Sequence, residues 1–172
     1  KIPLSVITKQ TLNSPIGVFD SGLGGLTVLK YLEKILPNES FIYFGDTAHV
    51  PYGTKSAEMV TLYSQHIMDF FLKYETKAVV IACNTASAVA FQHLKRTYDI
   101  PLFDVVTPSV EYSMKITKTQ KIGVVGTYST IQSSAYKRMF KDLGDTCTIQ
   151  EIPCPLFVPI IEEGWTDSAI AR

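Results

Sequence analysis

The sequence is poor in cysteine and has no excess of either charge. Only three cysteines occur in 172 residues, at irregular spacing and without a CxxC pair, and the three histidines are dispersed. We therefore expect neither a disulfide framework nor a metal site. The 16 basic and 16 acidic residues cancel, so the composition gives no sign of the basic surface that binds nucleic acid or an anionic membrane.

Long apolar segments are also absent from the sequence. No run approaches the roughly 20 residues that cross a bilayer, and residues 1–13 lack the layout of a signal peptide. We expect a cytoplasmic protein that acts on a small molecule, with neither nucleic acid nor membrane as a partner. The length suits one domain or two small ones.

The most informative stretch is a buried strand that ends in a cysteine. Residues 78–82 are apolar without alternation, which is typical of a strand covered on both faces of a parallel sheet. Cys83 follows, and Asn84, Thr85 and Ser87 are suited to capping the next helix. Ligands bind at this edge of open α/β sheets, and a helix N-terminus favours a thiolate, so Cys83 is a candidate base or nucleophile. A cysteine packed as a small apolar residue is the alternative.

The same order of strand, polar turn and helix recurs along the chain and predicts an α/β fold with a parallel sheet. The predicted strands are residues 16–19, 41–44, 78–82, 102–106, 121–125 and 146–149. The predicted helices are residues 26–36, 56–74, 84–98 and 109–116, one helix with apolar positions at 131, 135 and 139, and residues 160–165. We expect a first domain over residues 1–98 and a partial second domain over residues 99–172, after a loosely held lead-in at residues 1–14.

Polar residues also follow other predicted strands, with Thr127 and Thr130 at the ligand-facing edge of a second sheet. Asp20 and Ser21 stand in a glycine-rich turn that matches neither the dinucleotide fingerprint nor the P-loop, and the carboxylate suits an ammonium better than a phosphate. The long loop 45–54 is of the length that often carries function, although a simple Pro-Tyr-Gly turn would also explain it. Thr127 and Thr130 follow a later strand, where helix capping alone would account for one of them.

Taken together and in order, these segments resemble the glutamate racemases of the aspartate/glutamate racemase superfamily. The segments that carry the resemblance are FDSGLGGLTV at 19–28, GDTAHVPYG at 45–53, ACNTAS at 82–87, VVGTYSTI at 124–131 and PCPLFVPIIEEG at 153–164. The resemblance implies flavodoxin-like domains with helices on both faces of a parallel sheet, the second domain being incomplete.

The resemblance also implies a mechanism that uses two thiols and no cofactor or metal. One thiol removes the α-proton of glutamate, and an acid on the other face returns a proton. Cys83 would be the thiol that acts on D-glutamate, and Asp20 and Ser21 would orient that thiol and the substrate ammonium. The residues implied to bind the substrate are Asp20, Ser21, Tyr52, Gly53, Asn84, Thr85, Thr127 and Thr130.

One segment of the family pattern is missing from the sequence. Gly-Cys-Thr-His-Tyr-Pro, which carries the second catalytic cysteine in this family, does not occur. We interpret Cys147 and Cys154 as structural, because neither stands in such a segment. The chain therefore reads as the N-terminal two-thirds of a racemase and is expected not to racemise alone. Its full-length parent would interconvert L- and D-glutamate for peptidoglycan and could form a homodimer.

Two other functions remain open at this point. A racemase for aspartate or a related acid would use the same thiol chemistry. A non-catalytic domain that binds an acidic amino acid or a protein partner would not need the Cys83 thiol. The polar neighbours of Cys83 favour the catalytic interpretation.

Overall fold

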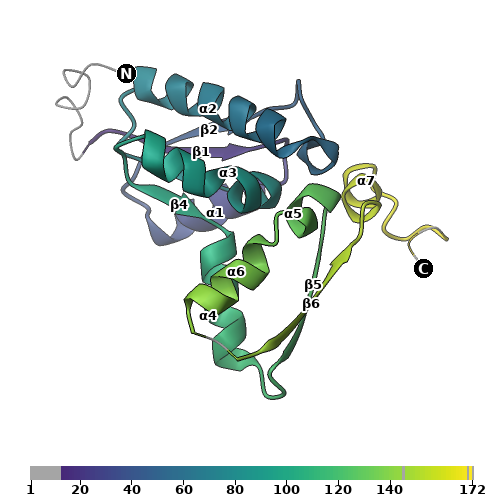
Figure 1. Ribbon diagram of the computed structural model, residues 1–172. Coiled ribbons are helices and arrows are strands. Elements are labelled where there is room, and N and C mark those ends of the chain that lie inside the picture. The colour runs from purple at the N-terminus through teal and green to yellow at the C-terminus, as the bar shows by residue number, and fades with distance from the viewer. Residues whose placement is uncertain (1–12, 145, 170, 172) are drawn as a thin grey trace.

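The computed structural model describes residues 13–144, 146–169 and 171, within which two parallel sheets share no strand (Figure 1). The expected lead-in at residues 1–14 lies almost wholly outside the described residues. In chain order the elements are β1 (Ile16–Asp20), α1 (Leu26–Ile35), β2 (Phe41–Gly45), a 3₁₀ turn (Tyr52–Thr54), α2 (Ala57–Lys73), β3 (Ala78–Ile81), α3 (Asn84–Thr97), β4 (Leu102–Asp104), α4 (Val106–Ile116), β5 (Lys121–Gly126), α5 (Tyr128–Gln132), α6 (Ala135–Asp142), β6 (Thr148–Pro153) and α7 (Phe157–Glu162).

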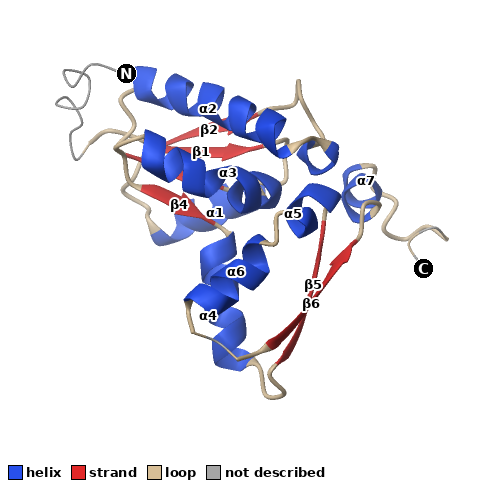
Figure 2. Cartoon of the chain, viewed as in Figure 1, coloured by secondary structure: helices blue, strands red, loops and turns tan. Residues whose placement is uncertain are grey.

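The first sheet has the strand order β2-β1-β3-β4, and all its neighbouring strands are parallel. The connection β1–α1–β2 runs in one direction along the sheet, and β2–α2–β3 and β3–α3–β4 run in the other, so right-handed crossovers place α1 on one face and α2 and α3 on the opposite face (Figure 2). This arrangement confirms the predicted α/β class. It also brings the carboxyl ends of β1 and β3 side by side.

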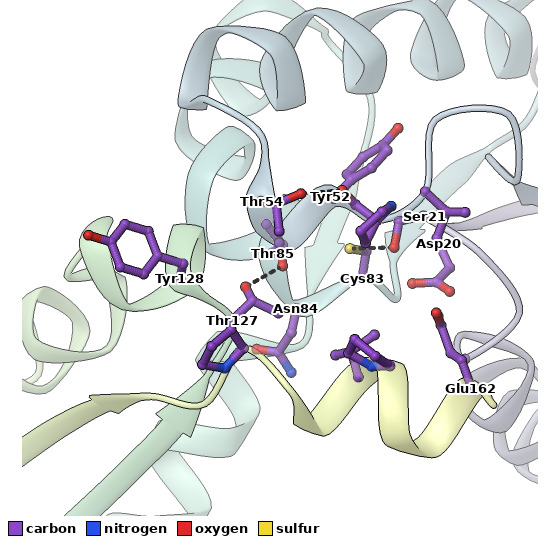
Figure 3. A pocket seen from close by; sticks show the side chains of 17 residues that line it. Asp20, Ser21, Tyr52, Thr54, Cys83, Asn84, Thr85, Thr127, Tyr128 and Glu162 are labelled. Atoms are coloured by element: carbon purple, nitrogen blue, oxygen red, sulfur yellow. Dashed lines mark hydrogen bonds between the residues drawn. The ribbon is translucent and has the colours of Figure 1, made fainter. Parts of the chain in front are cut away.

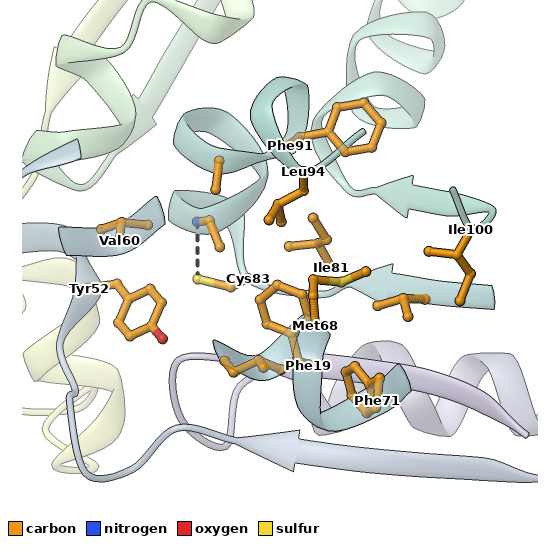
Figure 4. Packing of buried hydrophobic residues seen from close by; sticks show 14 residues of the cluster. Phe19, Tyr52, Val60, Met68, Phe71, Ile81, Cys83, Phe91, Leu94 and Ile100 are labelled. Carbon is orange, nitrogen blue, oxygen red and sulfur yellow. Dashed lines mark hydrogen bonds between the residues drawn. The ribbon is translucent and has the colours of Figure 1, made fainter. Parts of the chain in front are cut away.

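The main core lies between the first sheet and the helices α2 and α3. Phe19, Met68, Phe71, Ile81 and Leu94 are each fully buried there (Figure 4). Burial of a side chain of this size contributes about 1.5–3 kcal/mol. The apolar run before Cys83 is thus held in the core, which fixes the position of Cys83 and of the polar residues that follow it.

The second sheet consists of β5 and β6, paired in parallel. Helices α4 and α6 cover one of its faces, where Val110 and Phe140 are buried and Ile122 and Ile149 pack against them. Because successive strand residues point to opposite faces, the buried Val124 faces these helices and the exposed Val125 lies on the uncovered face.

The junction between the two sheets differs from the prediction. The strand predicted to reach residue 106 ends at Asp104, because the Asp104 carboxylate accepts hydrogen bonds from the backbone N–H groups of Val106 and Thr107, both at 3.0 Å, and starts α4. β4 pairs with β3 in the first sheet, although the predicted boundary after residue 98 assigns it to the second domain. The division into domains stays a prediction, but the change of sheet follows Asp104.

Three elements near the C-terminus are also displaced from their predicted positions. The single helix expected around residues 131–139 is split, because Ser134 adopts a left-handed conformation (φ 51°) between α5 and α6. β6 spans 148–153 rather than 146–149, since it pairs with β5 along its whole length. α7 begins at Phe157, three residues early, and admits Pro159 in its first turn, where no N–H is required. None of the described helices is long and apolar enough to cross a membrane.

Candidate active site

A cavity of about 200 Å³ opens where the carboxyl ends of β1, β3 and β5 converge (Figure 3). Both sheets and α7 contribute to its walls. The lining residues are Asp20, Ser21, Gly24, Val50, Pro51, Tyr52, Gly53, Thr54, Cys83, Asn84, Thr85, Thr127, Tyr128, Pro155, Val158, Pro159 and Glu162. The polar residues that follow β1, β3 and β5 thus lie around one cavity.

Cys83 lies at the wall of this cavity with only 4% of its surface exposed. It is itself the N-cap of α3, a position that we had assigned to the residues after it: its sulfur accepts a hydrogen bond from Ala86 N at 3.4 Å. The Cys83 thiol donates to Ser21 Oγ at 3.5 Å.

The pKa of Cys83 is shifted in the direction opposite to the one that a helix N-terminus favours. Burial raises the pKa of the thiol, and the nearby Asp20 carboxylate raises it further. Hydrogen bonds from Ser21 and from the backbone N–H groups of Ser21 and Ala86 lower the pKa by less. The helix N-terminus therefore does not lower the pKa of Cys83 below its ordinary value, because desolvation of the charged form dominates.

The Asp20 carboxylate is enclosed by the glycine-rich turn that follows it. Its Oδ2 accepts hydrogen bonds from Gly22 N at 3.1 Å and from Gly25 N at 3.0 Å. A Cβ at Gly25 would stand 2.6 Å from the Asp20 Cβ and 2.9 Å from that of Ala82, so only glycine fits there. The N–H groups of Gly22 and Gly25 thus donate to the Asp20 carboxylate of the same turn rather than to an external anion.

Tyr43 completes the base of this turn. Its hydroxyl donates to Gly22 O at 2.9 Å. Burial raises the pKa of Tyr43 to about 12, with further increases from the negative charges of Asp20 and Cys83. Tyr43 therefore remains a hydrogen-bond donor across the neutral range.

Three threonine hydroxyls join the two sheets beside Cys83. Thr85 Oγ1 lies 2.9 Å from Thr127 Oγ1 and 3.3 Å from Thr130 Oγ1, and Thr127 and Thr130 are 2.9 Å apart. Thr127 also caps α5 by accepting from Thr130 N. Thr85 and Thr127 line the cavity, whereas Thr130 is within hydrogen-bonding distance of both and lines an adjacent cavity.

The loop that carries Tyr52 and Gly53 is fixed from two sides. Tyr52 is 1% exposed, and its hydroxyl donates to Asp46 Oδ2 at 2.6 Å instead of entering the cavity. From α5, the Ser129 hydroxyl lies within donating distance of Gly53 O at 2.9 Å and Lys55 O at 2.7 Å. The loop therefore lines the cavity with its backbone and the Tyr52 ring, while the Tyr52 hydroxyl is bound to Asp46.

The electrostatic character of the cavity is acidic. Figure 3 shows the carboxylates of Asp20 and Glu162 facing one another across it. No lysine, arginine or histidine occurs among the described residues that line it. An ammonium group would be attracted between the two carboxylates. A carboxylate ligand would instead depend on neutral donors, such as the Asn84 amide, threonine hydroxyls and backbone N–H groups at the start of α3.

A model of the Asp/Glu/Hydantoin racemase family matches residues 16–170. This chain belongs to that family. The match covers both sheets and every element that lines the cavity.

Relatives of known name within the racemase family are similar over most of this chain. Glutamate racemase from Geobacter metallireducens is 51% identical over 157 residues, which are 91% of this chain and 58% of that protein. The crystal structure of glutamate racemase from Francisella tularensis in complex with D-glutamate has a TM-score of 0.85 at 42% identity, over 92% of this chain and 60% of the other. Glutamate racemase isoform RacE1 from Bacillus anthracis has a TM-score of 0.89 at 38% identity, over 93% and 60%. This chain thus spans about three-fifths of the length of these racemases.

Of the residues that the sequence assigned to the site, all but Thr130 line the cavity. Their individual roles stay predictions. Sequence reasoning missed Glu162, Thr54 and Tyr128, as well as the apolar wall from Val50, Pro51 and the α7 segment. The proline-rich segment before α7 was the available signal, but nothing in its pattern indicates that it folds over the ends of β1 and β3. Cys154 lines an adjacent cavity and not this one.

Proposed function

We propose that this chain is the part of a glutamate racemase that binds the substrate and carries one of the two catalytic thiols. The observation that carries the proposal is the position of Cys83, buried at the start of α3 between a carboxylate and a set of neutral donors. The parent enzyme would interconvert L- and D-glutamate and so supply D-glutamate for peptidoglycan. The named racemases that are similar over most of this chain support the choice of glutamate over another acid.

The acidic cavity explains how a thiol with a raised pKa can become a base. The substrate ammonium would lie between Asp20 and Glu162 and offset their negative charge. Because Asp20 is one of the groups that raise the pKa of Cys83, this compensation lowers that pKa when substrate binds. The Cys83 thiolate would then accept the α-proton of D-glutamate.

Removal of the α-proton leaves a pair of electrons that must be stabilised. They delocalise into the α-carboxylate, which gains negative charge in the transition state. Asn84, Thr85 and Thr127 offer neutral donors at the expected place, and preorganised donors of this kind are worth several kcal/mol to a reaction. Asp20 and Ser21 would hold the ammonium and the thiol in their relative positions.

Inversion requires an acid on the opposite face of the planar intermediate. Among the described residues that line the cavity, Cys83 is the one thiol. We therefore propose that the 172-residue chain exchanges the α-proton without racemising. Loss of one acid or base typically costs a factor of about 10² to 10⁴ in rate.

The test is proton NMR of D- and L-glutamate incubated with the purified chain in D₂O. We expect deuterium to enter the α-position of D-glutamate only, and Cys83→Ser to abolish the exchange. Inversion that depends on Cys83 would overturn the proposed lack of racemisation. D-Aspartate in the same assay distinguishes a racemase with another substrate. Binding of glutamate that Cys83→Ser leaves unchanged, without exchange in the native chain, would identify a non-catalytic binding domain.

For the parent enzyme we also propose a cytoplasmic location, free glutamate as partner, neither nucleic acid nor membrane as a partner, and a homodimeric state. A thiol that acts as a base must stay reduced, which the cytosol favours. The balanced charge of the chain supports the lack of a nucleic-acid partner.

A further inference from the structure

The Asn84 side chain is hydrogen-bonded to a residue of α6, outside the cavity that contains Cys83. The hydroxyl of Tyr136, on α6, donates a hydrogen bond of 2.7 Å to Asn84 Oδ1, on α3. Tyr136 does not line the cavity that contains Cys83. It lines a second cavity, of about 220 Å³, which shares Asn84, Thr127 and Val158 with the first.

This hydrogen bond decides which end of the Asn84 amide is available to a ligand. A carboxamide has one acceptor oxygen and two N–H donors, and rotation by about 180° exchanges them. With the oxygen held by Tyr136, the N–H₂ group is left to the first cavity, into which the Asn84 side chain extends beside α7 (Figure 3). Rotation would present an oxygen to the ligand instead.

The orientation of the Asn84 amide matters more in this acidic cavity than it would in a basic one. The first cavity contains the carboxylates of Asp20 and Glu162 and, among the described lining residues, no cationic side chain. A ligand carboxylate therefore gains its attraction from neutral donors, and an Asn84 oxygen facing it would add repulsion. Each lost donor to a charged group typically costs about 1.5–3 kcal/mol, or about 10- to 150-fold in affinity.

We propose that Tyr136 is a positioning residue that holds the Asn84 amide with its N–H₂ group toward the cavity and thereby sets the affinity for the carboxylate of an acidic amino acid. The identity of the ligand, an acidic amino acid, rests on the proposed function, whereas the orientation of the Asn84 amide does not. Tyr136 acts through Asn84 and makes no contact with substrate.

The surroundings of Tyr136 suit this role. Burial raises the pKa of its hydroxyl, the hydrogen bond with Asn84 lowers it by less, and the charge of Asp104 raises it again, so the pKa is raised on balance and the phenol stays protonated. Its ring packs against the cluster of Val106, Val110 and Phe140. Replacement by phenylalanine would keep this packing and remove only the hydroxyl.

The first experiment needs no ligand. The side-chain amide of Asn84 is assigned in ¹H–¹⁵N spectra by its absence from Asn84→Ser, and then followed in Tyr136→Phe. We expect its two proton signals to move toward the positions of a freely rotating amide while the backbone signals of α3 and β5 stay in place. Tyr112→Phe is the matched control, since Tyr112 is an exposed tyrosine of α4. An unchanged Asn84 amide in Tyr136→Phe would overturn the proposal.

The second experiment measures the dissociation constant of D-glutamate by NMR titration. We expect Tyr136→Phe to weaken binding about tenfold, Tyr112→Phe to leave it unchanged, and Tyr136→Phe to add nothing in an Asn84→Ala background. A full additional loss in that background would show that Tyr136 acts independently of Asn84 and would overturn the proposal. If the native chain does not bind glutamate, the proposed function fails, while the amide spectra still decide the geometry.

Discussion

The side-chain oxygens of Thr85 and Thr127 lie 2.9 Å apart, although Thr85 stands on α3, which packs on the first sheet, and Thr127 follows β5 of the second sheet as the N-cap of α5. Both line the cavity, so the two halves of its wall meet at a direct hydrogen bond. A small shift of one sheet against the other would therefore separate donors that must act on the same ligand.

The state of the Cys83 thiol can be tested by its rate of alkylation. Because the pKa of Cys83 is raised, we expect slow reaction with iodoacetamide at neutral pH and a rate that keeps rising with pH beyond about 8.5, the ordinary value for cysteine. Asp20→Asn removes a negative charge that raises this pKa, so the thiolate forms at lower pH and neutral alkylation becomes several times faster. Peptide mapping separates Cys83 from Cys147 and Cys154. A plateau below pH 8 in the native chain would contradict the assignment.

Gly53 allows the loop and β5 to approach each other closely. A Cβ at this position would meet the Thr127 Cβ and Cγ2 at 2.5 Å, so Gly53→Ala must push the two units apart. We expect a loss of about 1–3 kcal/mol in the free energy of unfolding, measured with urea. Gly123→Ala is the control, because nothing lies within 4 Å of a Cβ there. Equal stability of the two variants would show that the contact is not maintained in solution.

Ser129, on α5, connects the part of the chain around the second sheet to the loop that carries Tyr52 and Gly53. Its hydroxyl donates to Gly53 O and Lys55 O. Ser129→Ala leaves one buried carbonyl and one partly buried carbonyl without this donor, which typically costs about 1–3 kcal/mol. Hydrogen exchange should accelerate in β5 and β6 and remain slow in β1 and β3. Ser113→Ala, which removes an exposed hydroxyl within α4, should change neither. Uniform acceleration across both sheets would instead indicate a general loss of stability.

Tyr52 stabilises the loop through Asp46 rather than through a ligand. Tyr52→Phe removes the 2.6 Å hydrogen bond to a buried carboxylate that also contacts His49, and we expect a loss of about 1.5–3 kcal/mol in unfolding free energy. Glutamate affinity, normalised to the folded fraction, should change by less than twofold. Tyr31→Phe, on an exposed face of α1, serves as the control. A large loss of affinity at unchanged stability would place the phenol in the site.

The features that the sequence predicted well are those with a local physical cause. Val79 and Ile81 of the apolar run before Cys83 are buried in the core, and the polar residues after β1 and β3 meet because neighbouring parallel strands end at one edge of the first sheet. Thr127, after β5, reaches them from the second sheet. The resemblance to glutamate racemases added Tyr52 and Gly53, which the loop pattern alone did not single out.

The features that it missed depend on partners distant in the chain. Nothing near Tyr52 reveals that a buried Asp46 takes its hydroxyl, and nothing near Asn84 points to Tyr136, 52 residues later. The capping pattern after β3 predicted a thiolate, whereas the pKa of Cys83 is governed by the depth of burial, which sequence does not give. Glu162 enters the cavity only because α7 folds back over it.

The β5–β6 pair also bears on how this chain behaves in concentrated solution. Among the described residues β5 pairs with β6 alone, so its other edge presents backbone donors and acceptors, and the paired residues Val125 and Ile152 are both exposed on the uncovered face. An open parallel edge beside an apolar face is a template for strand addition. Loss of material during concentration should therefore begin at β5, and a lysine in place of Val125 should raise the solubility limit without disturbing Cys83.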